Sequence, residues 1–328
     1  MTHQLNYFSN LQKQFPSKRL LVEEIMRVLN ISSDATYRRM RGATALSTNE
    51  LFTLQEHFGG NHTGADWSFN LAGTTIDAPI KFIEQLEQGM ARIESLGPGA
   101  ELLIATPGVP FFHDVFAPHL TSFQLFILGT TCWEIPAWQN KAYNPKLIDQ
   151  RVLDRARGVG EAAYQLPSRE LWTNGMLDSI LTQIDFMHVS GRFAKEGIAE
   201  ELLDDLSRLV DRLENMAAYG RKYLPDTNPN SGTAFRPALN ELASRNDLLL
   251  VKSPQATLLS APFLAPNYLE TRDDSAIAAG LRWFERVERS ASGLGSNAGK
   301  HRMRFFNGLR RKIERTGKLI GRKDRIEI

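Results

Sequence analysis

Side chains that can bind a polyanion gather between Ser32 and Arg41 of this 328-residue sequence. The segment holds three arginines, two serines and a tyrosine within ten residues. A guanidinium group can donate to both major-groove acceptors of a guanine, and hydroxyl groups can donate to phosphate or base oxygens. The major groove of B-DNA admits one α-helix with phosphates on both sides. A helix that carries these residues outward would therefore have the chemistry to read DNA.

Two short helices joined by a tight turn are expected to position these side chains. The first has apolar residues spaced by three or four, which places them on one face, and it ends at Asn30. The second begins at Ser32 or Ser33, whose hydroxyl can accept from free amide groups of its first turn. Asp34 suits the positive end of the helix dipole, and Gly42 ends the helix. The apolar face of the first helix consists of Leu21, Ile25, Val28 and Leu29.

A third helix is predicted directly after this pair. Residues 47 to 50 read S-T-N-E, a capping box in which Ser47 and Glu50 satisfy each other's free amide groups. Leu51, Leu54 and Phe58 follow at helical spacing, and two glycines then end the helix. Helix, tight turn, basic helix and supporting helix are the parts of a helix-turn-helix module.

Residues 31 to 42, I-S-S-D-A-T-Y-R-R-M-R-G, resemble the recognition-helix segment of bacterial helix-turn-helix transcription regulators. The following L-S-x-x-E-L-x-x-L pattern resembles those with a phage-repressor type of supporting helix. The resemblance implies a DNA-binding helix from Ser33 to Arg41, with Tyr37 and Arg38 at positions used for base or phosphate contacts. Thr36 departs from the family pattern, which has an apolar residue there, so the rotation of the helix is open by one position.

The residues expected to contact DNA come from the turn and the second helix. Ala35 and Met40 are expected to face inward with Ile31, about one turn apart. The predicted DNA-binding residues are Ser32, Ser33, Asp34, Thr36, Tyr37, Arg38, Arg39 and Arg41.

A second resemblance covers nearly the whole chain. Three segments carry it: Y-Q-L-P-S-R-E-L-W from residue 164, N-Y-L-E-T-R-D from residue 267 and R-F-F-N-G-L-R-R-K-I from residue 304. Together they resemble a group of largely uncharacterised regulators in Bacteroidetes bacteria, which have an N-terminal helix-turn-helix and a long α/β region behind it. This resemblance implies no ligand and no catalytic residue.

Length and composition predict two domains. A chain of 328 residues with 42% hydrophobic residues can bury a large core. The sequence G-G-N-H-T-G at residues 59 to 64 is rich in turn formers and is the predicted boundary. We therefore expect a mixed fold: an all-α helix-turn-helix domain at residues 1–60, followed by a larger, helix-rich α/β (α+β) domain at residues 65–328 that senses a signal or dimerises.

Patterning within the second domain predicts its elements. Helices are expected at residues 77–96, 198–219 and 273–289, where apolar residues recur at helical spacing. Leu171, Trp172 and the apolar residues up to Ile184 are predicted to form one buried helix. Buried strands are expected at residues 101–106 and 123–128, and a hairpin at residues 247–252 and 256–261. The proline- and asparagine-rich segment 225–237 is predicted to be a loop.

Charge is unevenly distributed along the chain. Residues 1–60 carry seven Lys and Arg against five Asp and Glu, residues 61–280 carry 18 against 27, and residues 281–328 carry 14 against five. Both ends could therefore meet nucleic acid, while the middle would repel it. From His301 a basic amphipathic helix is predicted, with Met303, Phe306, Leu309 and Ile313 on its apolar side. We expect it to dock by this stripe, and the alternative is an additional, salt-sensitive contact to phosphates.

Other features restrict the cellular setting and the partners. Cys132 is the only cysteine, and it lies beside Trp133 in an apolar segment where an inert thiol is expected. A disulfide framework is therefore excluded, and a reducing cytoplasm is the simpler location. No apolar run approaches the roughly 18 residues that span a bilayer, and the N-terminus is no signal peptide. No cofactor and no membrane partner is predicted.

No catalytic motif is present, and an enzyme is not expected. His113, Asp114 and His119 invite a catalytic or metal-binding interpretation, but their spacing does not favour one. The prediction is a sequence-specific transcription regulator that binds double-stranded DNA as a homodimer, with a small-molecule effector as a further partner to consider. Two alternatives stay open: a protein-interaction adaptor, and an enzyme with a site near His113 and Asp114.

Overall fold

The protein divides into two compact units. The computed structural model describes residues 3–12, 15–58, 67–70, 76–241, 247–262 and 268–323. Unit 1 comprises residues 1–68 and 271–278, and unit 2 comprises residues 69–270 and 279–328. The predicted boundary at residues 59 to 64 lies outside the described residues. The boundary between the two compact units falls after residue 68, and the short segment 271–278 belongs to unit 1.

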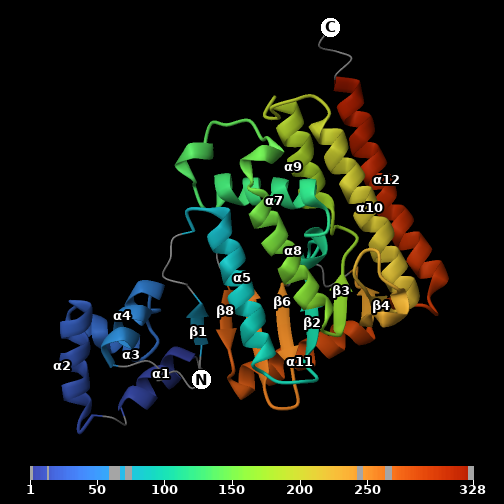
Figure 1. The fold of residues 1–328 in the computed structure, drawn as a ribbon. Coiled ribbons are helices and arrows are strands. Elements are labelled where there is room, and N and C mark those ends of the chain that lie inside the picture. Colours follow the sequence, from blue (N-terminus) through green and yellow to red (C-terminus); the bar gives the residue numbers. More distant parts are fainter. Residues whose placement is uncertain are drawn as a thin grey trace. The chain divides into compact units, whose positions relative to one another are not determined.

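Unit 1 is built around four helices: α1 (His3–Gln12), α2 (Lys18–Leu29), α3 (Ser33–Met40) and α4 (Thr48–Phe58). These helices are drawn in blue in Figure 1. Their apolar faces meet in one small core, to which each helix contributes. The buried members are Tyr7, Phe8, Leu11, Leu21, Val22, Ile25, Met40 and Leu54.

Local sequence signals set the limits of these helices. Asn30 adopts a left-handed conformation with φ 51° and ends α2, and Gly42 does the same after α3 with φ 72°. The Ser32 hydroxyl accepts from the Ala35 amide at 3.3 Å and begins α3. The predicted capping box is confirmed, because the Ser47 amide donates to the Glu50 carboxylate at 2.9 Å and the Glu50 amide donates to the Ser47 hydroxyl at 3.2 Å.

Three parallel strands form the centre of the sheet in unit 2: β2 (Glu101–Ala105), β3 (Ser168–Trp172) and β5 (Thr233–Leu239). The sheet order is β8-β7-β6-β2-β3-β5-β4, with β9 also pairing with β5. Leu102 pairs with Ser168, which in turn pairs with Phe235. The outer strands are β4 (Arg221–Lys222), β6 (Leu248–Lys252), β7 (Thr257–Pro262), β8 (Tyr268–Thr271) and β9 (Ser292–Gly293), and β1 (Trp67–Asn70) precedes them in the chain.

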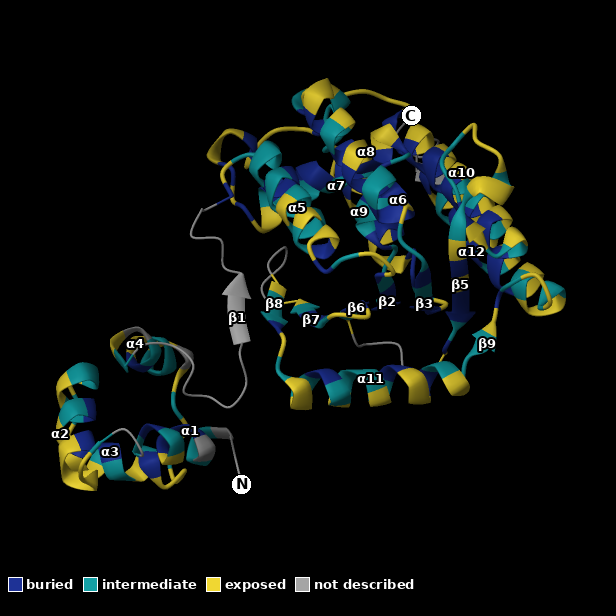
Figure 2. Cartoon of the chain, turned by 60° about the horizontal axis from the view of Figure 1, so that its bottom comes forward, coloured by how far each residue is buried: buried dark blue, intermediate teal, exposed yellow. Residues whose placement is uncertain are grey.

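Helices cover the sheet on both faces (Figure 2). Most of them lie on one face, because the chain returns from each parallel strand to the next through helical segments. On the opposite face lies α11 (Asp274–Arg289), whose Glu288 accepts from Arg169 of β3 at 2.8 Å. The larger helical layer comprises α5 (Pro79–Glu94), α6 (Phe111–Asp114), α7 (Pro118–Thr131), α8 (Gln150–Tyr164), α9 (Asp178–Val189), α10 (Ile198–Tyr219) and α12 (Gly299–Lys323).

The fold is therefore mixed α/β, as predicted, and several elements of unit 2 are confirmed. Helix α10 matches the predicted range 198–219, α5 and α11 lie within their predicted ranges, and β2 lies at the predicted strand. Strands β6 and β7 form the predicted antiparallel hairpin. Three short 3₁₀ helices, Pro136–Trp138, Pro145–Leu147 and Pro229–Ser231, occupy connecting segments.

Three predictions for unit 2 are wrong. Residues 123–128, predicted as a strand, lie inside α7, which begins at Pro118 and is buried around most of its circumference. A helix buried on all sides loses its periodic pattern and resembles a buried strand. Leu171 and Trp172 belong to β3 rather than to a helix, because a central parallel strand is also apolar on both faces. The predicted loop 225–237 is too long, since β5 begins at Thr233.

Candidate nucleic-acid interface

Helix α3 is supported on one side and exposed on the other. Its N-terminus follows a tight turn after α2, and both α2 and α1 pack against it. Gln4 of α1 donates to the carbonyls of Arg39 and Thr44 at 2.6 and 2.7 Å, which fixes the C-terminal end of α3. Ser33, Arg38 and Arg41 are exposed on the opposite side. The arrangement presents one face of a short, rigid helix to solvent.

Thr36 is not on that face, and its place among the predicted DNA-binding residues is wrong. Its side chain is 0% exposed, and its hydroxyl donates to the Ser32 carbonyl at 3.0 Å. A threonine can occupy an inward position because this bond to the preceding turn satisfies its only donor. The rotation of α3 left open by the sequence is therefore fixed with Thr36 and Met40 inward.

Arg39, another predicted DNA-binding residue, is engaged by other residues of unit 1. Its side chain is 16% exposed, and its Nε and Nη2 donate to one oxygen of Glu50 at 3.1 and 2.6 Å. Its Nη1 donates to the Ala35 carbonyl at 3.2 Å. This partly buried ion pair joins α3 to the first turn of α4, and it lowers the pKa of Glu50. The Arg39 side chain thus holds α3 against α4 and does not extend into solvent.

The remaining predicted residues stay accessible. Arg38 forms an ion pair with Asp34 at 2.9 Å, one helical turn earlier on the same exposed surface. An exposed pair of this kind is worth at most about 1 kcal/mol, so a phosphate or base can replace Asp34 as the partner of Arg38. Tyr37 is half-buried against the core of unit 1. We call Ser32, Ser33, Asp34, Tyr37, Arg38 and Arg41 the α3 surface.

Lys18 is a neighbour of the α3 surface that the sequence analysis missed. It is exposed at the start of α2, and its ammonium lies 5.7 Å from the centre of the Tyr37 ring. Nineteen positions separate the two residues, so no spacing rule indicates their proximity. Lys18 therefore adds a positive charge beside the α3 surface.

The basic helix at the C-terminus is docked, as expected. Its buried stripe contains Phe306, Leu309 and Ile313 as predicted, together with Phe305 and Ile320. Met303, predicted on this stripe, is exposed instead. Arg310 is held by Asp211 at 2.6 Å and Glu214 at 2.5 Å, two acids of α10. The charge of Arg310 is therefore matched by acidic residues within unit 2.

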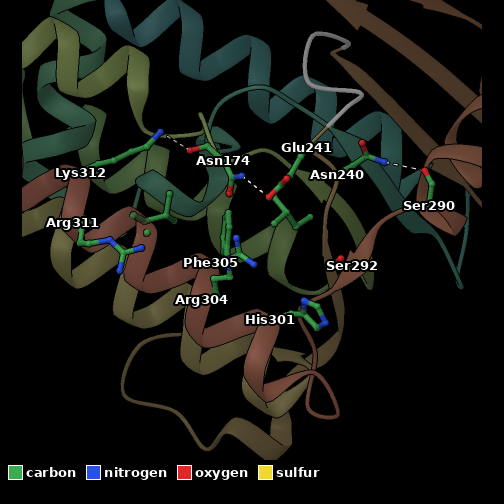
Figure 3. Close-up of a pocket in the computed structure, with 13 residues that line it drawn as sticks. Asn174, Asn240, Glu241, Ser290, Ser292, His301, Arg304, Phe305, Arg311 and Lys312 are labelled. Atoms are coloured by element: carbon green, nitrogen blue, oxygen red, sulfur yellow. Dashed lines mark hydrogen bonds between the residues drawn. The ribbon is translucent and has the colours of Figure 1, made fainter.

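A cavity of about 520 Å³ lies beside α12, at the carboxyl ends of β3 and β5 (Figure 3). This end of parallel strands is where α/β proteins commonly bind ligands. Several of the cavity's polar groups bond to one another. Asn174 donates to Glu241 at 2.8 Å, Lys312 donates to the Asn174 carbonyl at 2.7 Å, and Asn240 donates to Ser290 at 3.1 Å.

His113 belongs to a buried polar cluster. It is 0% exposed, and its Nδ1 and Nε2 lie 2.8 Å from the Tyr164 hydroxyl and 3.0 Å from Glu170. Burial lowers the pKa of His113. Burial alone would raise the pKa of Glu170, but His113 and the buried ammonium of Lys222 reverse that shift and lower it. The contacts with Tyr164 and Glu170 fix the orientation of the buried His113 ring.

Asp114 has a different hydrogen-bond partner from His113. Its carboxylate accepts from Gln124 at 2.7 Å. Among the described residues, no group of three His, Cys, Asp or Glu side chains could hold a metal ion. Cys132, predicted to be enclosed by apolar residues, is exposed at the end of α7. No helix in the described part of the chain has both the length and the apolar character to cross a membrane.

Comparison with known protein families, with curated proteins and with solved structures gives no match to this chain. The resemblance to helix-turn-helix regulators thus stays a prediction from short motifs. The functional argument therefore depends on the geometry and the charge of the α3 surface.

Proposed function

We propose that the protein is a transcription regulator that binds double-stranded DNA by placing α3 in the major groove. The observation that carries this proposal is the contrast between the two sides of α3. Arg39 and Thr36 fix its inner side through bonds to α4 and to the preceding turn, while Arg38 and Arg41 face solvent. A helix held this firmly can present donors to base edges with little loss of conformational freedom on binding.

The dimensions of α3 are compatible with this role. Its eight residues span about 12 Å at 1.5 Å per residue, which is close to the width of the major groove. The N-terminal part of a recognition helix commonly contacts bases, which would place Ser33 and Tyr37 near base edges. Asp34 can accept from a cytosine amino group but would repel phosphates, so it favours one orientation in the groove.

A dimer is part of the proposal. One short helix contacts only a few base pairs, whereas two copies on half-sites one helical turn apart multiply the specificity. We assign dimerisation and the sensing of a signal to unit 2, since unit 1 is occupied by the four helices that form and support the α3 surface.

The test is selection of binding sites from random duplex DNA by the full-length protein at near-physiological salt. The variant Arg38→Ala/Arg41→Ala removes two charges from α3, and Arg304→Ala/Arg311→Ala removes two exposed charges from α12. We expect the wild type and the α12 variant to enrich the same motif, while the α3 variant enriches none. The symmetry and spacing of that motif would report the dimer.

Absence of an enriched motif with the wild type would overturn the proposal. Capture of a protein partner through the same arginines would then favour the adaptor function. Equal loss of binding in both double variants would mean that total charge, and not the α3 surface, attracts DNA.

A further inference from the structure

The cavity of about 520 Å³ beside α12, which we call the α12 cavity, is basic on the side that α12 forms (Figure 3). Its volume lies within the range of small-molecule sites, about 300 to 1,000 Å³. Among the described residues, three lysine or arginine side chains line it against one acidic side chain. These are Arg304, Arg311 and Lys312 of α12, and Glu241, which follows β5. The α12 cavity therefore favours a small ligand with negative charge.

The two arginines of the α12 cavity differ from its lysine in having no acidic partner. Lys312 donates to Asp178 at 2.5 Å and to the Asn174 carbonyl at 2.7 Å. Arg304 and Arg311 are exposed, and neither guanidinium group forms a hydrogen bond or an ion pair with another residue in the described part of the chain. Both groups border the cavity and are accessible. Their N–H donors are therefore available to a ligand.

Gly308 leaves open space between these two arginines. Arg304 and Arg311 are seven positions apart, so they lie on the same side of α12 with two helical turns between them, and Gly308 lies midway. A Cβ atom at Gly308 would meet only Arg311 Nη2 within 4 Å, at 3.9 Å. The Arg311 guanidinium thus extends back one turn to the surface that Gly308 leaves uncovered. A phosphate group placed there could accept from guanidinium donors, which match its geometry.

The opposite side of the α12 cavity suits a ligand that carries hydroxyl groups. Glu241 is exposed, and the one bond that it accepts, from Asn174 at 2.8 Å, uses only part of the acceptor capacity of a carboxylate. Ser292 of β9 adds a hydroxyl group to this side. A carboxylate repels phosphate but accepts readily from a sugar hydroxyl. The charge distribution therefore orients a ligand with its phosphate at α12 and its hydroxyl groups at the strand ends.

We propose that the α12 cavity binds a sugar phosphate, free or as part of a nucleotide. Its phosphate lies over Gly308 between Arg304 and Arg311, and its hydroxyl groups face Glu241 and Ser292. A cationic ligand would meet two unpaired guanidinium groups, and an apolar ligand would leave both without a partner. The site lies at the carboxyl ends of parallel strands, where α/β folds commonly bind ligands. The inference holds whether or not unit 1 binds DNA.

The first test is isothermal titration of the full-length protein at near-physiological salt with ribose 5-phosphate, adenosine 5′-monophosphate, ribose and inorganic phosphate. We expect at least one of the two phosphate esters to bind at least tenfold more tightly than ribose and than inorganic phosphate. Tighter binding of adenosine 5′-monophosphate than of ribose 5-phosphate would identify a nucleotide, and the reverse would identify a free sugar phosphate. The proposal fails if neither ester binds at millimolar concentration, or if inorganic phosphate binds as tightly as both.

A pair of double variants separates the α12 cavity from the general charge of α12. Arg304→Ala/Arg311→Ala removes the two unpaired charges at the cavity, so affinity for the ester should fall at least tenfold. Arg315→Ala/Lys318→Ala removes two exposed charges of the same helix that do not border the cavity, and it should bind the ester normally. An equal loss in both variants would mean that total charge attracts the ester, which contradicts the proposal.

A third variant tests the place of the phosphate without a change of charge. Gly308→Phe fills the space between the two arginines, and the distance of 3.9 Å to Arg311 Nη2 leaves room for its Cβ atom. We expect it to abolish binding of the ester while the thermal unfolding transition stays within a few degrees of the wild type. Wild-type affinity in this variant would place the ester elsewhere and overturn the proposal.

Discussion

Helices α3 and α12 are both basic, yet their arginines meet different surroundings. On α12, Arg310 is paired with Asp211 and Glu214 of α10, and Lys312 is paired with Asp178 of α9. On α3, the exposed Arg38 has Asp34 of its own helix as its one ion-pair partner among the described residues. Arg310 and Lys312 therefore stabilise the docking of α12, whereas Arg38 keeps only an exposed ion pair within its own helix.

The source of the difference is the supply of acidic neighbours. Residues 61–280 carry 27 acidic against 18 basic side chains, and α12 packs against two helices of that region. In unit 1 the supporting helix α4 offers Glu50, which Arg39 occupies. A run of arginines in a sequence thus identifies a binding surface only after the acids that fold beside it are known.

The largest effect should come from removing the apolar stripe that docks α12. Phe306 is fully buried and packs edge-on against Trp172. Phe306→Ala should lower the free energy of unfolding of unit 2 by about 3 to 5 kcal/mol, because it removes apolar contacts and leaves a cavity. Denaturant unfolding followed by tryptophan fluorescence measures this change. A cost below about 1 kcal/mol would show that α12 is not a structural helix, and the contrast with α3 would fail.

Removing Arg38 should weaken DNA binding and have little effect on stability. Arg38→Ala should cost about 1 to 3 kcal/mol of binding at the selected DNA site if the side chain contacts a base, with little change in unfolding. Arg310→Ala is the matched control on α12, and it should leave DNA affinity unchanged while it lowers the stability of unit 2 by about 1 kcal/mol. Titrations against the selected site and against a scrambled duplex separate the two effects. An equal loss on both duplexes would reassign Arg38 to a phosphate.

Features encoded by neighbouring residues could be predicted from the sequence. The turn at Asn30, the Ser32 cap and the reciprocal bonds of Ser47 and Glu50 each involve groups within a few residues, so their residue types are sufficient evidence. Helix α10 was found over its whole length because one side is apolar and the other acidic along all 22 residues. Such elements need no tertiary information.

Features that depend on distant partners could not be predicted. The apolar sequence of α7 is compatible with a helix or a strand, and only packing on all sides decides between them. Arg39 became a structural residue because Glu50, eleven residues away, lies beside it in the fold. Lys18 lies beside the Tyr37 ring, and no local pattern indicates that the two residues meet.

The Arg39–Glu50 pair should make unit 1 sensitive to acid. The pair lowers the pKa of Glu50 below its ordinary value of 4.5, so the stabilisation is present above that pH and is lost as the pH falls through the lowered value. Arg39→Ala should lower the stability of unit 1 by about 1 kcal/mol at pH 7 and have less effect below the lowered pKa. Hydrogen exchange of α3 amides at several pH values measures this, with Arg38→Ala as the control that lacks the effect. A pH-independent cost would show that Arg39 acts through packing alone.

The smallest effect is expected at Thr36, and it distinguishes the inner side of α3 from the α3 surface. Thr36→Val keeps the shape of the buried side chain and removes only the hydroxyl, whose bond to the Ser32 carbonyl is local. The free energy of unfolding should change by less than about 1 kcal/mol, and the affinity for the selected site should stay within twofold. Ser33→Ala, a comparable loss of one hydroxyl on the exposed side, should weaken DNA binding if Ser33 contacts the duplex. A greater loss of DNA affinity at Thr36 than at Ser33 would mean that α3 rotates about its axis when it binds DNA. The orientation of α3 in the unbound protein would then differ from the one used on DNA.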